Sequence, residues 1–166
     1  MNYHNLRIRK ATKSDAKFIL NTYNYGVKKL KFVNKDPISF KSHLLWLDKN
    51  LKKKNVYIYI ATKIPELKKV GYIRFEKIKT KTWEISIANN PFFYGKGYGS
   101  KFIQKTLNKF KGKNKFIAIV KNNNKSSINF FLKNKFIKKN NKKYLVKKQI
   151  SLTNFSYFEF SQRLIS

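Results

Sequence analysis

Three of the six glycines in this chain fall within five residues, in the segment Tyr94–Ser100. A strand-like run, Thr82–Asn89, precedes them, and a helix-like run beginning at Lys101 follows. Glycine lets the backbone approach a ligand closely, and the unpaired N–H groups at a helix start favour an anion such as phosphate. The sequence therefore predicts an anion-binding turn between a strand and a helix. The alternative is a tight turn that binds no ligand.

Periodicity and turn residues predict the other elements. Further strands are expected at residues 6–9, 56–61, 70–75 and 116–120, with weaker candidates at 136–137 and 144–146. Helices are expected at residues 16–23, 40–51 and about 101–110, and after the capping residues 124–127, whereas residues 24–36 read as a loop. This order of strands and helices predicts an α/β fold, a mixed sheet with helices on both faces.

A single domain accounts for the length of 166 residues, which allows a sizeable core. We expect this domain to cover residues 1–150, with residues 151–166 as a C-terminal extension of unknown role. The chain has no cysteine, which excludes disulfides and thiolate metal sites, and we expect no metal. Its start has no apolar signal core, and no apolar run approaches the roughly 18 residues of a spanning helix, so we expect a cytoplasmic protein.

The formal net charge of +32 is compatible with binding to nucleic acid or to an anionic membrane surface. However, only four of the 39 basic residues are arginine, the residue suited to bidentate recognition of phosphates and bases. The lysines are spread along the whole chain, and asparagine and isoleucine are also abundant, which indicates compositional drift. We therefore do not expect a nucleic-acid partner, although the charge attracts an acidic cofactor or substrate.

Three segments together resemble the GNAT superfamily of N-acetyltransferases, over about residues 6–147. The run Tyr94–Gly99 is similar to the family's acetyl-CoA motif Arg/Gln-x-x-Gly-x-Gly/Ala, with Tyr94 in place of Arg or Gln. The opening Leu6–Thr12, followed by Asp15, resembles the family's first strand and helix start. Residues 124–136 resemble the late segment Asn-x-x-Ser-x-x-x-Tyr-x-x-x-Gly-Phe, with Phe131 and Lys135 in place of its tyrosine and glycine.

The resemblance implies a mainly antiparallel sheet of the acyl-CoA N-acyltransferase fold, with acetyl-CoA as co-substrate. The implied acetyl-CoA site consists of the end of the strand, the glycine turn and one asparagine of the late segment: Ile87, Ala88, Asn89, Tyr94, Gly95, Lys96, Gly97, Tyr98, Gly99, Ser100 and Asn124. Because backbone N–H groups make most such contacts, the change at Tyr94 need not abolish binding.

Catalytic residues are harder to assign because Phe131 cannot donate a proton. Glu84 is one of only seven acids, and a carboxylate near the cleft can deprotonate the acceptor amine. The alternative for Glu84 is a surface or salt-bridged carboxylate. Tyr144 is a candidate general acid for the leaving thiolate, although its spacing does not single it out.

The stretch Pro37–Leu47 is similar to GNAT members encoded with bacterial surface-sugar genes, some of which acetylate a nucleotide-linked amino sugar. His43 and Trp46 are its candidate substrate residues, and each is equally compatible with packing. We therefore expect direct acetyl transfer to a primary amine. The favoured acceptor is an amino sugar on a nucleotide carrier. A protein N-terminus or lysine is the second acceptor, and a non-catalytic basic nucleic-acid or membrane-surface binding module is the rival class.

Overall fold

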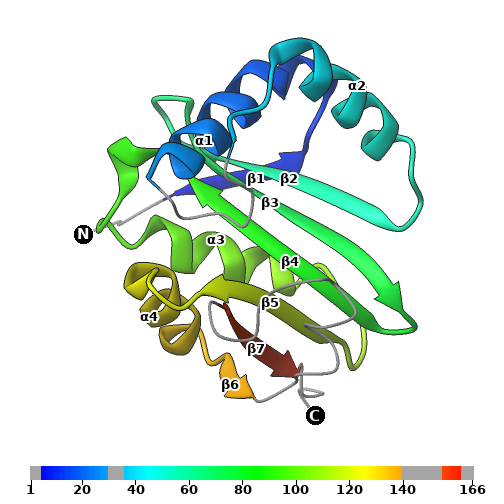
Figure 1. The fold of residues 1–166 in the computed structure, drawn as a ribbon, viewed down its shortest axis with the longest axis vertical. Helices are drawn as coiled ribbons and strands as arrows, with labels where there is room; N and C mark the ends of the chain where they lie inside the picture. The colour runs from blue at the N-terminus through cyan, green and yellow to red at the C-terminus, as the bar shows by residue number, and fades with distance from the viewer. Residues whose placement is uncertain (1–4, 30–35, 140–154, 162–166) are drawn as a thin grey trace.

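The computed structural model describes residues 5–29, 36–139 and 155–161 (Figure 1). Seven strands form one sheet in the order β1-β2-β3-β4-β5-β7-β6. Their bounds are Leu6–Lys10 (β1), Val56–Lys63 (β2), Lys68–Lys79 (β3), Thr82–Asn89 (β4), Lys115–Lys121 (β5), Ile137–Lys139 (β6) and Phe155–Ser161 (β7). Every neighbouring pair is antiparallel except β4 and β5, which are parallel. The mixed, mainly antiparallel α/β sheet is thereby confirmed.

Helices cover both faces of the sheet. The helices are α1 (Ala16–Lys28), α2 (Phe40–Leu51), α3 (Tyr98–Leu107) and α4 (Lys125–Lys133), with short 3₁₀ turns at Lys13–Asp15 and Pro91–Phe93. Successive side chains of a strand point to opposite faces. On β4, Trp83 and Ile85 therefore join the core that contains Phe102 of α3, whereas Ala88 joins the core beneath α1 and α2.

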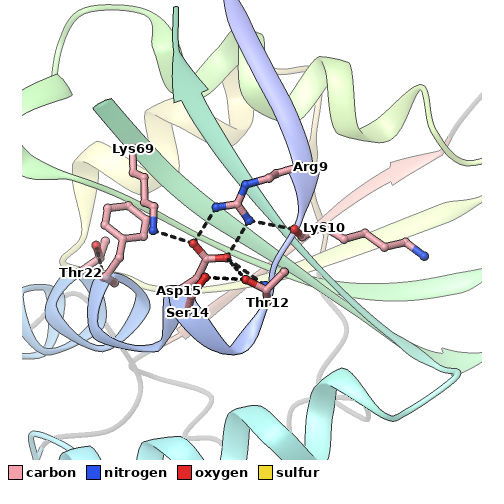
Figure 2. Close-up of polar contacts among 8 residues, drawn as sticks. Arg9, Lys10, Thr12, Ser14, Asp15, Thr22 and Lys69 are labelled. Carbon is pink, nitrogen blue, oxygen red and sulfur yellow. Dashed lines mark hydrogen bonds and ion pairs between the residues drawn. The ribbon is translucent and has the colours of Figure 1, made fainter. Parts of the chain in front are cut away.

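A buried ion cluster ties β1, the start of α1 and β3 together (Figure 2). The fully buried Asp15 carboxylate accepts hydrogen bonds from both terminal nitrogens of Arg9, at 2.7 and 2.8 Å, and from Lys69 Nζ at 2.7 Å. The Thr12 backbone N–H also donates to it. Burial alone would raise the pKa of Asp15, but these hydrogen bonds outweigh it and hold the pKa well below its usual range.

Two segments differ from the sequence-based expectation. Helix α1 continues to Lys28 instead of ending near residue 23, because Gly26 and Val27 are buried and the Asn24 side chain bonds both backbone polar groups of Ile38. Residues 155–161, which showed no recognisable pattern, form β7 between β5 and β6. The strand expected at residues 144–146 lies outside the described residues.

In the part of the chain that the structure describes, no helix is long and apolar enough to cross a membrane.

Candidate active site

The parallel strands β4 and β5 separate part-way along their length (Figure 1). Their pairing covers only three residue pairs and ends at Glu84 and Ile117. The last five residues of β4, from Ile85 to Asn89, remain paired with β3 on their other side. The edge of β4 that faces β5 therefore presents backbone N–H and C=O groups to a gap that opens within the sheet.

A cavity of about 330 Å³ lies at this gap. Four segments line it: the end of β4, the glycine turn with the start of α3, one face of α4 from its N-cap to its last residue, and α1. The lining residues are Thr22, Gly26, Ile87, Ala88, Asn89, Phe93, Tyr94, Gly95, Gly97, Gly99, Ser100, Asn124, Ser126, Ser127, Phe130 and Lys133. The cavity thus joins the glycine turn to the face of the sheet covered by α1.

The glycine turn requires glycine at its three positions for two reasons, backbone conformation at Gly95 and Gly97 and lack of space at Gly99. Gly95 and Gly97 have φ values of +73° and +77°, in the left-handed region, and Gly97 is the N-cap of α3. Gly99 lies in the first turn of α3, where a Cβ would come within 2.6 Å of the Asn89 side chain and 3.1 Å of the Phe130 ring. The first N–H groups of α3 have no partner within the helix and meet the cavity at its end.

Asn89 lies between two glycines, since a Cβ on Gly71 of β3 would also come within 2.6 Å of its side chain. Its Oδ1 atom is buried without a hydrogen-bond donor. Buried polar atoms are normally paired, and an orphaned one beside a cavity marks a place for a ligand group. The Asn89 carboxamide therefore has an unused acceptor on the side of Gly71, while its Nδ2 atom faces Gly99 of α3.

Asn124 caps α4 as the sequence predicts. Its Oδ1 accepts hydrogen bonds from the Ser127 backbone N–H at 3.2 Å and from the Ser126 hydroxyl at 2.9 Å. This cap fixes the start of α4 against the cavity, where Ser126, Phe130 and Lys133 follow one another on one helix face.

Residues 5–137 match the acetyltransferase (GNAT) domain family. The chain belongs to this family. It is an acetyl-CoA-dependent N-acetyltransferase by that membership, and acetyl-CoA is its co-substrate.

Solved structures with the same fold include other acetyltransferases. A domain from Methanocaldococcus jannaschii DSM 2661 superposes with a TM-score of 0.75 at 22% identity, covering 96% of this chain and 99% of that one. Spermidine N-acetyltransferase from Vibrio cholerae, solved with CoA and spermine, gives 0.78 at 16% identity, covering 95% of each chain. The protein yncA from Salmonella typhimurium, solved with acetyl-CoA, gives a TM-score of 0.73 at 18% identity, covering 98% of this chain and 96% of that one. No curated protein matches the sequence.

In this GNAT domain, nine of the eleven residues expected to bind acetyl-CoA line the cavity, and Lys96 and Tyr98 do not. The Lys96 side chain is exposed, with its ammonium group 4.2 Å from the centre of the Phe92 ring. The Tyr98 ring is buried in the core, 5.1 Å from the Phe93 ring. Burial raises the pKa of Tyr94, which lines the cavity, and the neighbouring Tyr25 adds to this.

Glu84 lies at the point where β4 and β5 separate, on the face covered by α1 and α2. It pairs across the sheet with Glu76 of β3 and Ile117 of β5. Glu84 does not line the cavity, and three residues of extended strand, about 10 Å, separate it from Ile87. A proton passing between the two places needs a water or the acceptor itself to bridge that distance.

His43 and Trp46 lie on α2, away from the cavity lining. Their rings stack at 5.4 Å, and the Arg74 guanidinium lies 6.0 Å from the Trp46 ring. His43 is buried, which lowers its pKa, although a hydrogen bond with the Ala16 backbone opposes the shift. Their role in binding substrate stays a prediction.

The position of the family's tyrosine is occupied by a core residue. Phe131 is 4% exposed and packs its ring against Phe130, Phe136 and Phe158. It does not line the cavity, so nothing at this position protonates a leaving group. Tyr144, the candidate acid, lies outside the described residues.

The contributions of α1 and of the α4 face to the cavity were not predicted from the sequence. Thr22 and Gly26 line the cavity from α1. Thr22 lies in the predicted helix without being singled out, and Gly26 lies in the segment expected to be a loop. The i, i+4, i+7 spacing of Ser126, Phe130 and Lys133 marks one helix face and was available as a clue.

Proposed function

We propose that acetyl-CoA binds in the cavity between β4 and β5 and that the acetyl group passes to a small-molecule primary amine. The observation that carries this proposal is the end of the β4–β5 pairing at Glu84, next to a cavity that reaches the glycine turn. Backbone groups of Ile87–Asn89 would hold the pantetheine arm as an added strand would, and the N–H groups of α3 would hold the pyrophosphate.

Bound acetyl-CoA supplies the activated thioester. The free amine of the acceptor attacks its carbonyl directly, since the chain has no cysteine to carry the acetyl group. The C–S bond then breaks, so the acceptor becomes an amide and CoA leaves as the thiolate, which takes up the proton still held by the attacking nitrogen. An amine arrives protonated at neutral pH, and Glu84 takes up that proton, directly or through a water. A backbone N–H at the end of β4 stabilises the negative charge on the carbonyl oxygen.

The acceptor class is supported by chemistry and by relatives rather than by a defined pocket. The Vibrio cholerae spermidine N-acetyltransferase, solved with CoA and spermine, supports a small cationic amine. An amino sugar on a nucleotide carrier, the acceptor expected from residues 37–47, has no support among these relatives and stays one acceptor to test. A cytoplasmic location likewise stays a prediction.

The test is amine-dependent release of free CoA thiol with spermidine, a nucleotide-linked amino sugar and a peptide N-terminus as acceptors. Glu84→Gln should lower kcat/KM by about 100-fold or more at neutral pH, the usual contribution of a general base. The loss should shrink at high pH, where the amine arrives unprotonated. Glu76→Gln is the matched control, because it makes the same change on the paired position of β3.

Equal rates for the Glu84→Gln and Glu76→Gln variants would remove Glu84 from the mechanism. Absence of thiol release with every amine, together with duplex DNA binding that weakens steeply as salt rises, would instead favour the basic binding module.

A further inference from the structure

A hydrogen bond between Ser100 and Asn134 connects the start of α3 to the end of α4, beside the cavity. Ser100 lies in the first turn of α3 and lines the cavity. Asn134 is the C-cap of α4, is 5% exposed and does not line the cavity. Asn134 Nδ2 lies 3.0 Å from Ser100 Oγ and 2.8 Å from the Phe130 carbonyl oxygen. The contact is therefore a side-chain bridge from α4 to the anion-binding end of α3.

The chemistry of the hydrogen-bonding groups identifies the donor and the acceptor in this contact. The Phe130 carbonyl can only accept, so the Asn134 atom that faces it is the amide nitrogen. The same nitrogen donates to Ser100, which makes Ser100 Oγ an acceptor in this contact. The serine proton is then left over, and among residues 5–29, 36–139 and 155–161 no group lies in position to accept it. A hydroxyl that lines a cavity with an unused proton is a donor for a ligand oxygen.

The other end of the Asn134 amide supports a role beyond holding the helices together. Its Oδ1 atom is buried without a hydrogen-bond partner. Such an atom is costly, and an apolar side chain of similar size would fill the space without that cost. The amide nitrogen is the part of Asn134 that is used, and Ser100 is its partner at the cavity.

We propose that Asn134 is a positioning residue for cofactor binding. By occupying the acceptor side of Ser100 Oγ, it turns the serine proton toward the pyrophosphate of CoA, where a charge-assisted hydrogen bond forms. The inference rests on the placement of CoA in the cavity proposed above. It adds a residue outside the glycine motif that acts through Ser100 and touches no part of the cofactor.

The test is CoA binding by calorimetry to Ser100→Ala, Asn134→Ala and the double variant, at a temperature where circular dichroism shows all to be folded. Each single variant should weaken CoA binding about tenfold, as expected for one hydrogen bond to a charged group. The double variant should bind no more weakly than Ser100→Ala, because Asn134 acts only through that hydroxyl. The same losses should appear with 3′-dephospho-CoA, which keeps the pyrophosphate. Asn129→Ala, at an exposed position of α4, should bind CoA as the wild type does.

If the loss of CoA affinity in the double variant equalled the product of the losses in the two single variants, Asn134 would act independently of Ser100. That result would overturn the inference. Wild-type binding by Asn134→Ala, or a loss that vanishes with 3′-dephospho-CoA, would overturn it as well. Failure of the proposed site itself is recognised separately, because Gly95→Trp would then leave CoA binding unchanged.

Discussion

At the scale of single residues, the site depends on the close packing of the Asn89 side chain against two glycines. Asn89 fills the space between Gly71 and Gly99, and its position beside the cavity is set by both glycines. The two glycines differ in what a Cβ would meet. At Gly71 it would come within 2.6 Å of the Ala88 backbone oxygen, whereas at Gly99 the closest atom belongs to the Asn89 side chain.

This difference predicts unequal effects of alanine at the two glycines. Gly71→Ala should lower the free energy of unfolding by about 2–3 kcal/mol and Gly99→Ala by about 1–2 kcal/mol, in the usual range for overpacking. Adding Asn89→Ala should restore part of the stability of Gly99→Ala but not of Gly71→Ala, because the Ala88 oxygen stays. Urea denaturation of the four variants measures this. Equal rescue of both would show that the Ala88 oxygen is not the obstacle.

A second prediction concerns Phe131, the residue at the position of the family's tyrosine. Phe131→Tyr would place a hydroxyl among phenylalanine rings in the core. We expect it to destabilise the fold by about 1–3 kcal/mol through the unpaired hydroxyl and to leave kcat unchanged. Steady-state kinetics and thermal melting measure the two effects. A rise in kcat would show that the ring reaches the cavity and that a tyrosine there can serve as acid.

At the scale of elements, one carboxylate holds β1, α1 and β3 in place (Figure 2). Asp15 is fully buried, while the side chains of its partners Arg9 and Lys69 are 35% and 32% exposed. Because both partners reach water, each can be hydrated when the carboxylate is removed. The loss should then be smaller than for a fully buried pair.

Asp15→Asn should accordingly cost about 2 kcal/mol at pH 7. The pKa of Asp15 is lowered in the folded protein, so its contribution is complete above the unfolded pKa of about 4 and is lost as pH falls below it. The difference in stability between wild type and variant should therefore narrow below pH 4. Urea denaturation from pH 7 to pH 3 measures it. A constant difference would show that Asp15 acts through packing rather than charge.

Much of the element pattern could be predicted from the sequence, and the failures have physical causes. Strand β4 and the capping of α4 by Asn124 follow from local pattern and are confirmed. Strand β7 showed no alternation because residues 156–159 are buried on both faces inside the sheet. The continuation of α1 depends on Asn24 bonding Ile38, fourteen residues away, which no local pattern reveals.

At the scale of the whole molecule, the cavity is assembled from segments that are remote in sequence. Eight residues predicted from the glycine motif and the end of β4 line it, together with Asn124 from the late segment, but Thr22, Gly26 and Phe130 come from helices that the motif does not include. Sequence could predict the backbone cradle. The sequence did not predict which side chains of α1 and α4 close the cavity, nor that Glu84 lies away from the cavity. Both depend on how remote segments pack in three dimensions. The net charge of +32 surrounds this site with a field that favours an anionic cofactor.

A matched pair of glycine substitutions shows whether acetyl-CoA binds in this cavity. Gly95 and Gly112 have φ values of +73° and +77°, and a Cβ at either position meets no atom within 4 Å. Only Gly95 lines the cavity. Tryptophan at either position should cost about 1–2 kcal/mol of stability through the same backbone strain. Calorimetric titration with acetyl-CoA should show wild-type affinity for Gly112→Trp and no measurable binding for Gly95→Trp. Equal affinities in the two variants would show that acetyl-CoA does not bind at the glycine turn.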